Sequence, residues 1–218
     1  QEIADASPGT IRFFTANLLD QGAFVEAMKG CRVVFHTASP FAMNATIDPQ
    51  RDLVDPAVKG TANVLLTAKE TKTVQRVVQT SSVGAIYADA SDTYSAPKNT
   101  LTEAIWNTTS TLTHQPYFLS KTLAEKKAWE IANSQEQWKL VTINPSLILG
   151  PGLRYHASSE SFKTLLKLGG FHFSMLTGVP NFAMPMVDVR DVATAHIRAA
   201  FDSEVPSGRY IVSAANST

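Results

Sequence analysis

The chain has 218 residues, with 19 Lys and Arg against 19 Asp and Glu, so its formal net charge is zero. Hydrophobic residues make up 44% and charged residues 17%, which provides enough apolar material for a packed core. These values exclude collagen, coiled-coil and disordered classes. The balanced charge also argues against binding nucleic acid through bulk electrostatic attraction.

The cysteine count and the apolar runs bear on where the protein resides. Cys31 is the single cysteine, so an internal disulfide is excluded and a cytoplasmic protein is favoured. No apolar run reaches the length of a membrane helix, and residues 1–9 lack the order of a signal peptide. We therefore expect no association with a membrane.

Strand-length apolar runs alternate with helix-length segments along the chain. The pattern predicts strands at residues 11–15, 32–36, 76–80, 140–144 and 209–212, and helices at 21–28, 52–69, 117–133, 162–168 and 192–201. This alternation is typical of an α/β fold with a mostly parallel sheet. Ligands bind beyond the carboxyl ends of such strands, where Thr37, Ser82 and Pro145 lie in the sequence.

Two parts of this pattern lie outside the regular elements. The polar stretch of residues 89–115 is predicted to be a long functional loop, and Pro145 is expected to break the strand before it. Asp188 and Asp191 are expected to cap the helix that begins near Val192.

Tyr117 and Lys121 form the sharpest chemical signal. They are four residues apart in a predicted helix, so the phenol and the ammonium share a face. A cation beside a tyrosine favours the phenolate and lowers the phenol pKa, which suits a group that donates a proton to a developing alkoxide. The pair alone is a weak signal, because many surface helices contain it.

Hydroxyl groups follow the strand that ends near residue 80. Ser82 can hydrogen-bond to a substrate carbonyl there, whereas loop or cap chemistry is the better interpretation for Ser81. His36 ends the preceding strand, and a hydrogen-bonded structural histidine is the favoured interpretation for it. The small residues after His36 would let a cofactor approach the backbone closely.

Six segments carry a family resemblance, in the family's order, at residues 34–40, 58–64, 78–82, 117–125, 144–151 and 187–193. With them the chain resembles extended short-chain dehydrogenases/reductases, and more narrowly the dihydroflavonol-4-reductase-like branch that includes fungal methylglyoxal/isovaleraldehyde reductases. The resemblance implies a Rossmann-like, doubly wound parallel sheet. Residues 1–150 would form part of a dinucleotide-binding domain, and residues 151–218 part of a small substrate lobe with a returning helix and strand.

The resemblance also implies an activity, the NADPH-dependent reduction of a small or medium aldehyde or ketone. Tyr117 would be the general acid, Lys121 would lower its pKa and hold the nicotinamide ribose, and Ser82 would polarise the carbonyl. The implied cofactor is NADP, with NAD as the alternative, and no metal is implied. Cofactor contacts are implied for Thr37, Ala38, Ser39, Thr80, Tyr117, Lys121, Pro145, Ile148 and Ser161, and a substrate pocket for Phe41, Tyr87 and Phe182, with Phe171 and Phe173 as further walls.

The chain departs from the family's pattern at several points. It contains no Gly-x-x-Gly-x-x-Gly sequence for the pyrophosphate, so the resemblance covers the middle of the family and lacks both ends. The 218 residues alone are therefore expected to be inactive. Asn17 stands at the family's acidic adenine position, and Ala57 at the position of a helix Asn. Tyr87 is bulky, which argues for a substrate smaller than a dihydroflavonol.

Two alternatives remain open. One is a nucleotide-sugar epimerase or dehydratase, and the other is a catalytically inactive binding fragment. For the preferred activity we expect a small-molecule carbonyl partner, no nucleic acid partner, and a monomer or homodimer.

Overall fold

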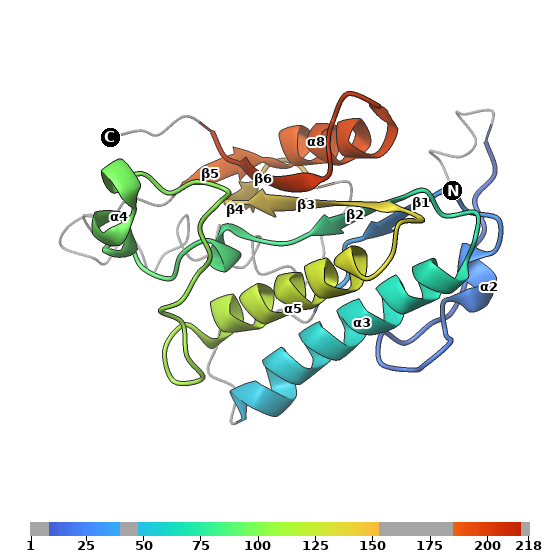
Figure 1. Cartoon of the computed structure of the whole chain (residues 1–218), viewed down its shortest axis with the longest axis horizontal. Helices are drawn as coiled ribbons and strands as arrows, with labels where there is room; N and C mark the ends of the chain where they lie inside the picture. The colour runs from blue at the N-terminus through green and yellow to red at the C-terminus, as the bar shows by residue number, and fades with distance from the viewer. Residues whose placement is uncertain (1–8, 40–47, 153–184, 215–218) are drawn as a thin grey trace.

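The computed structural model describes residues 9–39, 48–152 and 185–214 (Figure 1). Its helices are α2 (Val25–Met28), α3 (Asp55–Glu70), α4 (Asp92–Ser95), α5 (Pro116–Asn133) and α8 (Val189–Phe201). Its strands are β1 (Val33–His36), β2 (Arg76–Thr80), β3 (Lys139–Pro145), β4 (Leu147–Leu149), β5 (Met186–Asp188) and β6 (Gly208–Val212). Short helical turns lie at η1 (Gln50–Val54), η2 (Val83–Ala85) and η3 (Pro97–Asn99).

Four strands form the central sheet in the order β1-β2-β3-β6, and every neighbouring pair is parallel. Val77 of β2 pairs with Leu140 of β3, and Val141 of β3 pairs with Gly208 of β6. A second parallel pair is formed by β4 and β5. The predicted α/β class with a parallel sheet is confirmed. Because all four central strands are parallel, their carboxyl ends lie along one edge of the sheet.

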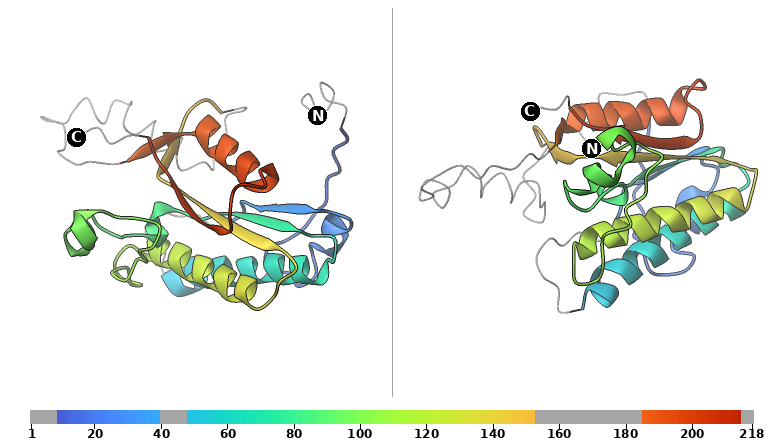
Figure 2. Two further views of the ribbon diagram at one scale, coloured as in Figure 1. Left: turned by 45° about the horizontal axis from the view of Figure 1, so that its top comes forward. Right: turned by 60° about the vertical axis from the view of Figure 1, so that its left-hand side comes forward.

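Helices cover both faces of the sheet, as a doubly wound fold requires. Helices α3 and α5 lie side by side on one face, and α8 lies on the other (Figure 2). Successive residues of a strand point to opposite faces, so Val77 packs in the core under α3 and α5, whereas Val78 packs with Ala199 of α8. Each fully buried aliphatic side chain contributes about 1.5–3 kcal/mol to stability.

Local sequence explains where the main helices begin. Pro56 and Pro116 occupy the first turns of α3 and α5, where proline's missing N–H has no helical partner to lose. Asp188 precedes α8, and its side chain accepts a hydrogen bond from the Arg190 backbone N–H at 2.8 Å. The predicted cap at Asp188 is confirmed, although the helix begins at Val189. Asp191 lies in the first turn.

The predicted strand at residues 11–15 is wrong. These residues pair with no strand of the described residues, and Phe13 is 83% exposed. An apolar run becomes a strand only when a neighbouring strand satisfies its backbone, and the pattern itself does not supply that neighbour.

Other boundaries differ by smaller amounts. Only Val25–Met28 of the predicted helix at residues 21–28 is α-helical, and the helix predicted at 52–69 is a π-helical turn followed by α3. Strand β3 includes Pro145 rather than ending before it, and the chain passes into the second sheet two residues later. The helix predicted at residues 162–168 lies outside the described residues. Among the residues that the structure describes, no helix is both long and apolar enough to span a bilayer.

Candidate active site

Helix α5 carries both residues of the sharpest sequence signal. Tyr117 lies in its first turn and Lys121 one turn later, with the lysine Nζ 5.7 Å from the centre of the tyrosine ring. Lys121 is buried, with an exposed fraction of 7%. The sequence predicted that the two side chains share a helix face, and the short separation agrees with it.

A close approach brings the turn that carries Ser82 against the beginning of α5. A Cβ atom added to Gly84 would lie 2.5 Å from the Phe118 ring, so only glycine allows this packing. The Ser82 Oγ accepts a hydrogen bond from the Gly84 N–H at 3.0 Å, and the Gly84 carbonyl accepts one from the Thr122 hydroxyl at 3.2 Å. The residues after β2 and the first turns of α5 therefore form one packed unit.

Burial changes the proton affinities of the pair. It raises the pKa of the Tyr117 phenol, because the phenolate would lose its hydration. Burial also lowers the pKa of the Lys121 ammonium to about 8, while the nearby Glu125 carboxylate opposes that change. The direction for Tyr117 is opposite to the one predicted from the neighbouring cation, because the sequence did not show that the phenol would lose part of its hydration in the fold.

A small hollow lies beyond the carboxyl ends of β1 and β2. Its walls are His36, Ala38, Ser39, Thr61, Gln79, Thr80, Ser81, Lys121 and Ala124. Four predicted cofactor-binding residues are thereby brought together, namely Ala38, Ser39, Thr80 and Lys121. Thr37 is exposed beside them, at the end of β1. Tyr117 and Ser82 are not part of this wall.

His36 is a buried, neutral wall of the hollow. Its Nε2 lies 3.3 Å from the Thr61 hydroxyl of α3, as expected for a hydrogen-bonded structural histidine. Burial, with a smaller effect of the Lys121 charge, lowers the pKa of the His36 imidazole to about 4. Among the described residues of the wall, a neutral His36 leaves Lys121 as the cationic side chain.

The Thr80 hydroxyl is committed to a neighbour on the other face of the sheet. His196 of α8 directs its Nδ1 to the Val192 carbonyl at 2.8 Å, so Nδ1 carries a proton. Its Nε2 shares a hydrogen bond with the Thr80 hydroxyl at 2.7 Å. The Thr80 hydroxyl is therefore held in place from the α8 side of the sheet.

The remaining predicted site residues lie in several places. Pro145 is buried at the end of β3 and paired with Val212, and Ile148 is half-buried in β4. Neither belongs to the wall of the hollow. Tyr87 is half-buried shortly after η2, and burial raises its pKa. Phe41, Ser161 and Phe182 lie outside the described residues, as do Phe171 and Phe173.

Asn17 and Ala57, the two positions that depart from the family's pattern, make few polar contacts. Asn17 is exposed, and its side chain accepts a hydrogen bond from the Leu19 N–H at 3.1 Å. Ala57 is buried in the first turns of α3 and has no polar group to offer.

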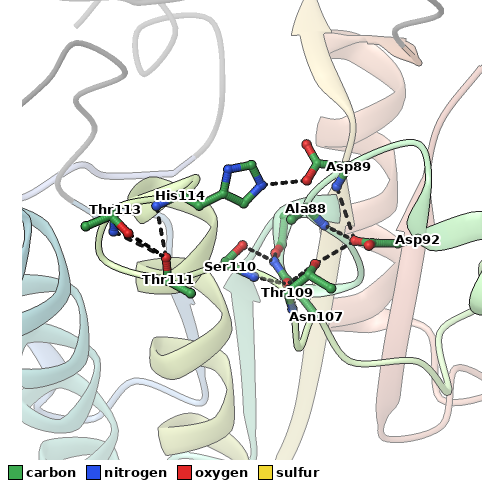
Figure 3. A network of polar contacts seen from close by, with 10 residues as sticks. Ala88, Asp89, Asp92, Asn107, Thr109, Ser110, Thr111, Thr113 and His114 are labelled. Atoms are coloured by element: carbon green, nitrogen blue, oxygen red, sulfur yellow. Dashed lines mark hydrogen bonds and ion pairs between the residues drawn. The ribbon is translucent and has the colours of Figure 1, made fainter.

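The long polar loop after Tyr87 is ordered by its own side chains (Figure 3). Asp92 Oδ2 accepts hydrogen bonds from the Ala88 N–H at 2.8 Å and the Thr109 hydroxyl at 2.7 Å. Asn107 fastens the loop to η2, because its Nδ2 donates to the Gly84 carbonyl at 2.7 Å. His114 pairs with Asp89 at 2.5 Å just before α5 begins. The loop is thus a structured border of the candidate site.

The sequence reasoning missed Glu125, which is the most connected polar side chain near the site. It is fully buried and pairs with Arg209 of β6, whose Nε lies 2.6 Å from Glu125 Oε1. The spacing could have revealed it, because Tyr117, Lys121 and Glu125 follow one another at intervals of four on one helix face. Arg209 and His196 carried no such signal.

Comparison with known proteins places this geometry in a family. The model of the NAD dependent epimerase/dehydratase family matches residues 1–213. Cinnamoyl-CoA reductase CAD2 of Medicago truncatula is 36% identical over 209 residues, and anthocyanidin reductase of Arabidopsis thaliana is 33% identical over 219 residues. These matches cover 94% and 96% of the chain.

The fold comparison agrees. The crystal structure of yeast methylglyoxal/isovaleraldehyde reductase Gre2 complexed with NADPH superposes with a TM-score of 0.76 at 31% identity, covering 90% of the chain and 61% of Gre2. The chain spans 61% of the length of the Medicago reductase and 63% of that of the Arabidopsis reductase. The match over residues 1–213 shows that the chain belongs to the NAD dependent epimerase/dehydratase family.

Proposed function

We propose that the protein carrying this chain is an NADPH-dependent carbonyl reductase that acts on a small or medium aldehyde or ketone. The observation that carries the proposal is the buried Lys121, one helical turn from Tyr117 and in the wall of a hollow at the carboxyl edge of the sheet. A buried ammonium beside a phenol is costly unless it has a use. The named relatives are reductases, which supports the same reaction type.

The residues around the hollow fit the nicotinamide end of a dinucleotide. Ala38 and Ser39 are small enough to admit a ligand close to the backbone, and Lys121 offers an ammonium that ribose hydroxyls can bind. Thr80 adds a hydroxyl that His196 holds in place. A bound reduced nicotinamide supplies a hydride to the carbonyl carbon. Pro145, Ile148 and Ser161 remain proposed cofactor contacts, as does Thr37.

Residues of this chain supply the proton that the carbonyl oxygen receives. Tyr117 keeps its proton at neutral pH, because burial raises the phenol pKa, and donates it from Oη to the carbonyl oxygen as that oxygen gains charge. Ser82 donates its hydroxyl proton in a hydrogen bond to the same oxygen, and the Lys121 ammonium stabilises the resulting tyrosinate. The products are an alcohol and a deprotonated Tyr117, which regains a proton from solvent.

The border of the site favours a small substrate. Tyr87 is half-buried and follows η2 by two residues, and the loop after it is fixed by Asp92 and Asn107. We propose that Tyr87, with Phe41 and Phe182, lines the substrate pocket. We also propose residues 1–150 as part of the dinucleotide-binding domain and residues 151–218 as part of the substrate lobe, in a cytoplasmic monomer or homodimer.

The test is an NADPH-consumption assay of the full-length protein with a panel of aliphatic and aromatic aldehydes and ketones. UDP-sugars are tested in parallel for protection against thermal unfolding. Turnover of at least one carbonyl, with no protection by UDP-sugars, is the expected result. Protection by a UDP-sugar without any carbonyl turnover would reverse the proposal in favour of nucleotide-sugar chemistry.

A matched pair of lysine variants tests the role of the buried Lys121. Lys121→Met should lower kcat by at least about 100-fold, because proton transfer and its charge stabilisation are both lost. Lys127→Met is the control, since Lys127 lies on the same helix and pairs with Glu130 on the surface. Equal activity of the two variants would contradict the role of Lys121.

A further inference from the structure

Glu125 lies behind the candidate site and is surrounded by donors. Its Oε2 accepts hydrogen bonds from the Ser81 hydroxyl at 2.5 Å and from Asn144 Nδ2 at 2.7 Å. Its Oε1 accepts hydrogen bonds from three further donors, namely Arg209 Nε at 2.6 Å, Thr142 Oγ1 at 3.1 Å and Trp129 Nε1 at 3.3 Å. Five donors facing one carboxyl group match its ionised, acceptor-only form.

The Glu125 carboxylate fixes the turn that carries Ser82 by two routes. Ser81 is the neighbouring residue, and its hydroxyl ends on Glu125 Oε2. Asn144 Nδ2 donates to the same oxygen and also to the Ser82 carbonyl at 3.0 Å. Backbone and side chain of this turn are thus both tied to one carboxylate on α5.

The charge of Glu125 also faces Lys121, which precedes it by one helical turn. Among the described residues, the other titratable groups around Lys121 are Tyr117 on the same helix and His36 at the end of β1. Helix α3 and strand β2 present only uncharged groups to the hollow, namely Thr61, Gln79 and Thr80. Among these groups of the described residues, Glu125 is the one whose negative charge favours the ammonium form of Lys121.

Arg209 completes the arrangement from β6, on the same face of the sheet as α5. Its guanidinium donates to the carbonyls of Ile105 at 2.6 Å, Glu103 at 2.8 Å and Ala85 at 3.1 Å, and it stacks 3.7 Å from the centre of the Trp106 ring. The cation offsets the charge of Glu125 and holds its carboxylate in one orientation.

We propose that Glu125 is a positioning residue for the reduction: it fixes the Ser82 turn through Ser81 and Asn144, and it keeps Lys121 protonated beside Tyr117. The inference rests on the proposed function for its catalytic meaning. Glu125 touches neither the substrate nor the reacting atoms, and it acts through Lys121 and Ser82.

The test measures the protonation of Lys121 directly, in the full-length protein. Lysine side chains labelled at Cε with carbon-13 are titrated by NMR, and the Lys121 resonance is identified by its loss in Lys121→Arg. In the parent the transition is expected near pH 8. Glu125→Gln should lower it by about one pH unit, because the neighbouring negative charge is removed. Glu125→Asp should keep it near the parent value.

Two further variants protect the result from a folding failure. Glu130→Gln is the matched control, since it makes the same change on the surface of the same helix and should leave the transition unchanged. Glu125→Gln combined with Arg209→Gln removes the ion pair as a whole and should lower the transition as the single variant does. An unchanged transition in a folded Glu125→Gln protein would overturn the proposal. Failure of every Glu125 variant to fold would overturn it as well, because Glu125 would then serve folding alone.

Turnover provides the second readout. Glu125→Gln should lower kcat by about tenfold or more while changing the KM for the carbonyl by less than about threefold. If the parent turns over no carbonyl, the proposed function fails, while the Lys121 titration still reports the coupling. If the parent is active and the titration is unchanged, only the role of Glu125 fails.

Discussion

Two polar networks flank the candidate site, and they differ in burial far more than in geometry. The network around Glu125 has hydrogen bonds of 2.5 to 3.3 Å and lies inside the fold. The network of the loop at residues 88–114 has bonds of 2.5 to 3.4 Å and lies mostly at the surface (Figure 3). Bond length alone therefore does not separate the buried network from the one that orders a surface loop.

The two networks differ in whether water can replace a hydrogen-bond partner that a mutation removes. Water can solvate Asp92 or His114 if a bond in the loop breaks, so each bond there has a small net value. No water replaces a donor lost at Glu125, because the side chain is fully buried. We expect the consequences of mutation to follow burial, and four predictions examine this in order of expected size.

Arg209→Met should have the largest effect on stability. It leaves the Glu125 carboxylate buried and without its cation, which should lower the free energy of unfolding by about 3–5 kcal/mol. Urea denaturation measures it. Arg190→Met is the control, because Arg190 pairs with Asp188 at the same 2.6 Å but at the surface, and it should leave stability nearly unchanged. Equal losses in the two variants would show that burial is not the deciding factor.

His36 should make stability depend on pH. The imidazole pKa is about 4 in the folded chain and 6.5 in the unfolded one, so the unfolded state takes up the proton first as the pH falls. The free energy of unfolding should therefore be fully retained above pH 6.5 and fall by up to about 3 kcal/mol toward pH 4.

His36→Gln should flatten that dependence, since the amide does not titrate. Denaturation at a series of pH values, compared with His114→Gln at the surface, isolates the contribution. An identical slope in the parent and in His36→Gln would contradict the neutral, buried state of His36.

Asn107→Ala should cause an intermediate loss of stability, because Asn107 is the buried residue that joins the loop network to η2. The change removes the donor to the Gly84 carbonyl and the acceptor for the N–H groups of Thr109 and Ser110. We expect a loss of about 1–3 kcal/mol, read from thermal or urea unfolding. Asn133→Ala at the exposed end of α5 is the control, and a comparable loss there would refute the assignment.

Removal of the His114–Asp89 pair should have the smallest effect on stability. Both side chains are exposed by more than a third, so a double-mutant cycle with His114→Gln and Asp89→Asn should give a coupling below about 1 kcal/mol. Added salt should reduce the coupling further. A coupling as large as that between Glu125 and Arg209 would remove the distinction between the two networks.

The sequence predicted the parts of the fold that local pattern controls. The apolar runs of β2 and β3 and the long helix α5 have clear periods, and the structure places them within one residue of the predicted ends. Residues 11–15 have the same apolar pattern without a neighbouring strand, and there the prediction was wrong. Pairing is a property of the whole sheet, so a single run does not reveal it.

The site was predictable where chemistry and spacing coincide, and less so where contacts come from distant segments. The four-residue spacing of Tyr117 and Lys121 in a predicted helix was enough to indicate that the two side chains share a face. Arg209 reaches Glu125 across 84 positions, and His196 reaches Thr80 across 116, so no local pattern indicates either contact. The direction of the Tyr117 pKa change was missed for the same reason, because burial depends on the packing of the complete fold.

The most direct test of the account is the rate of NADPH-dependent carbonyl reduction by Tyr117→Phe in the full-length protein. Phenylalanine keeps the ring packed beside Lys121 and removes only the proton donor. We expect kcat to fall by about 100-fold or more, while Tyr94→Phe at the exposed α4 retains full activity. A Tyr117→Phe enzyme as fast as the parent would contradict the account.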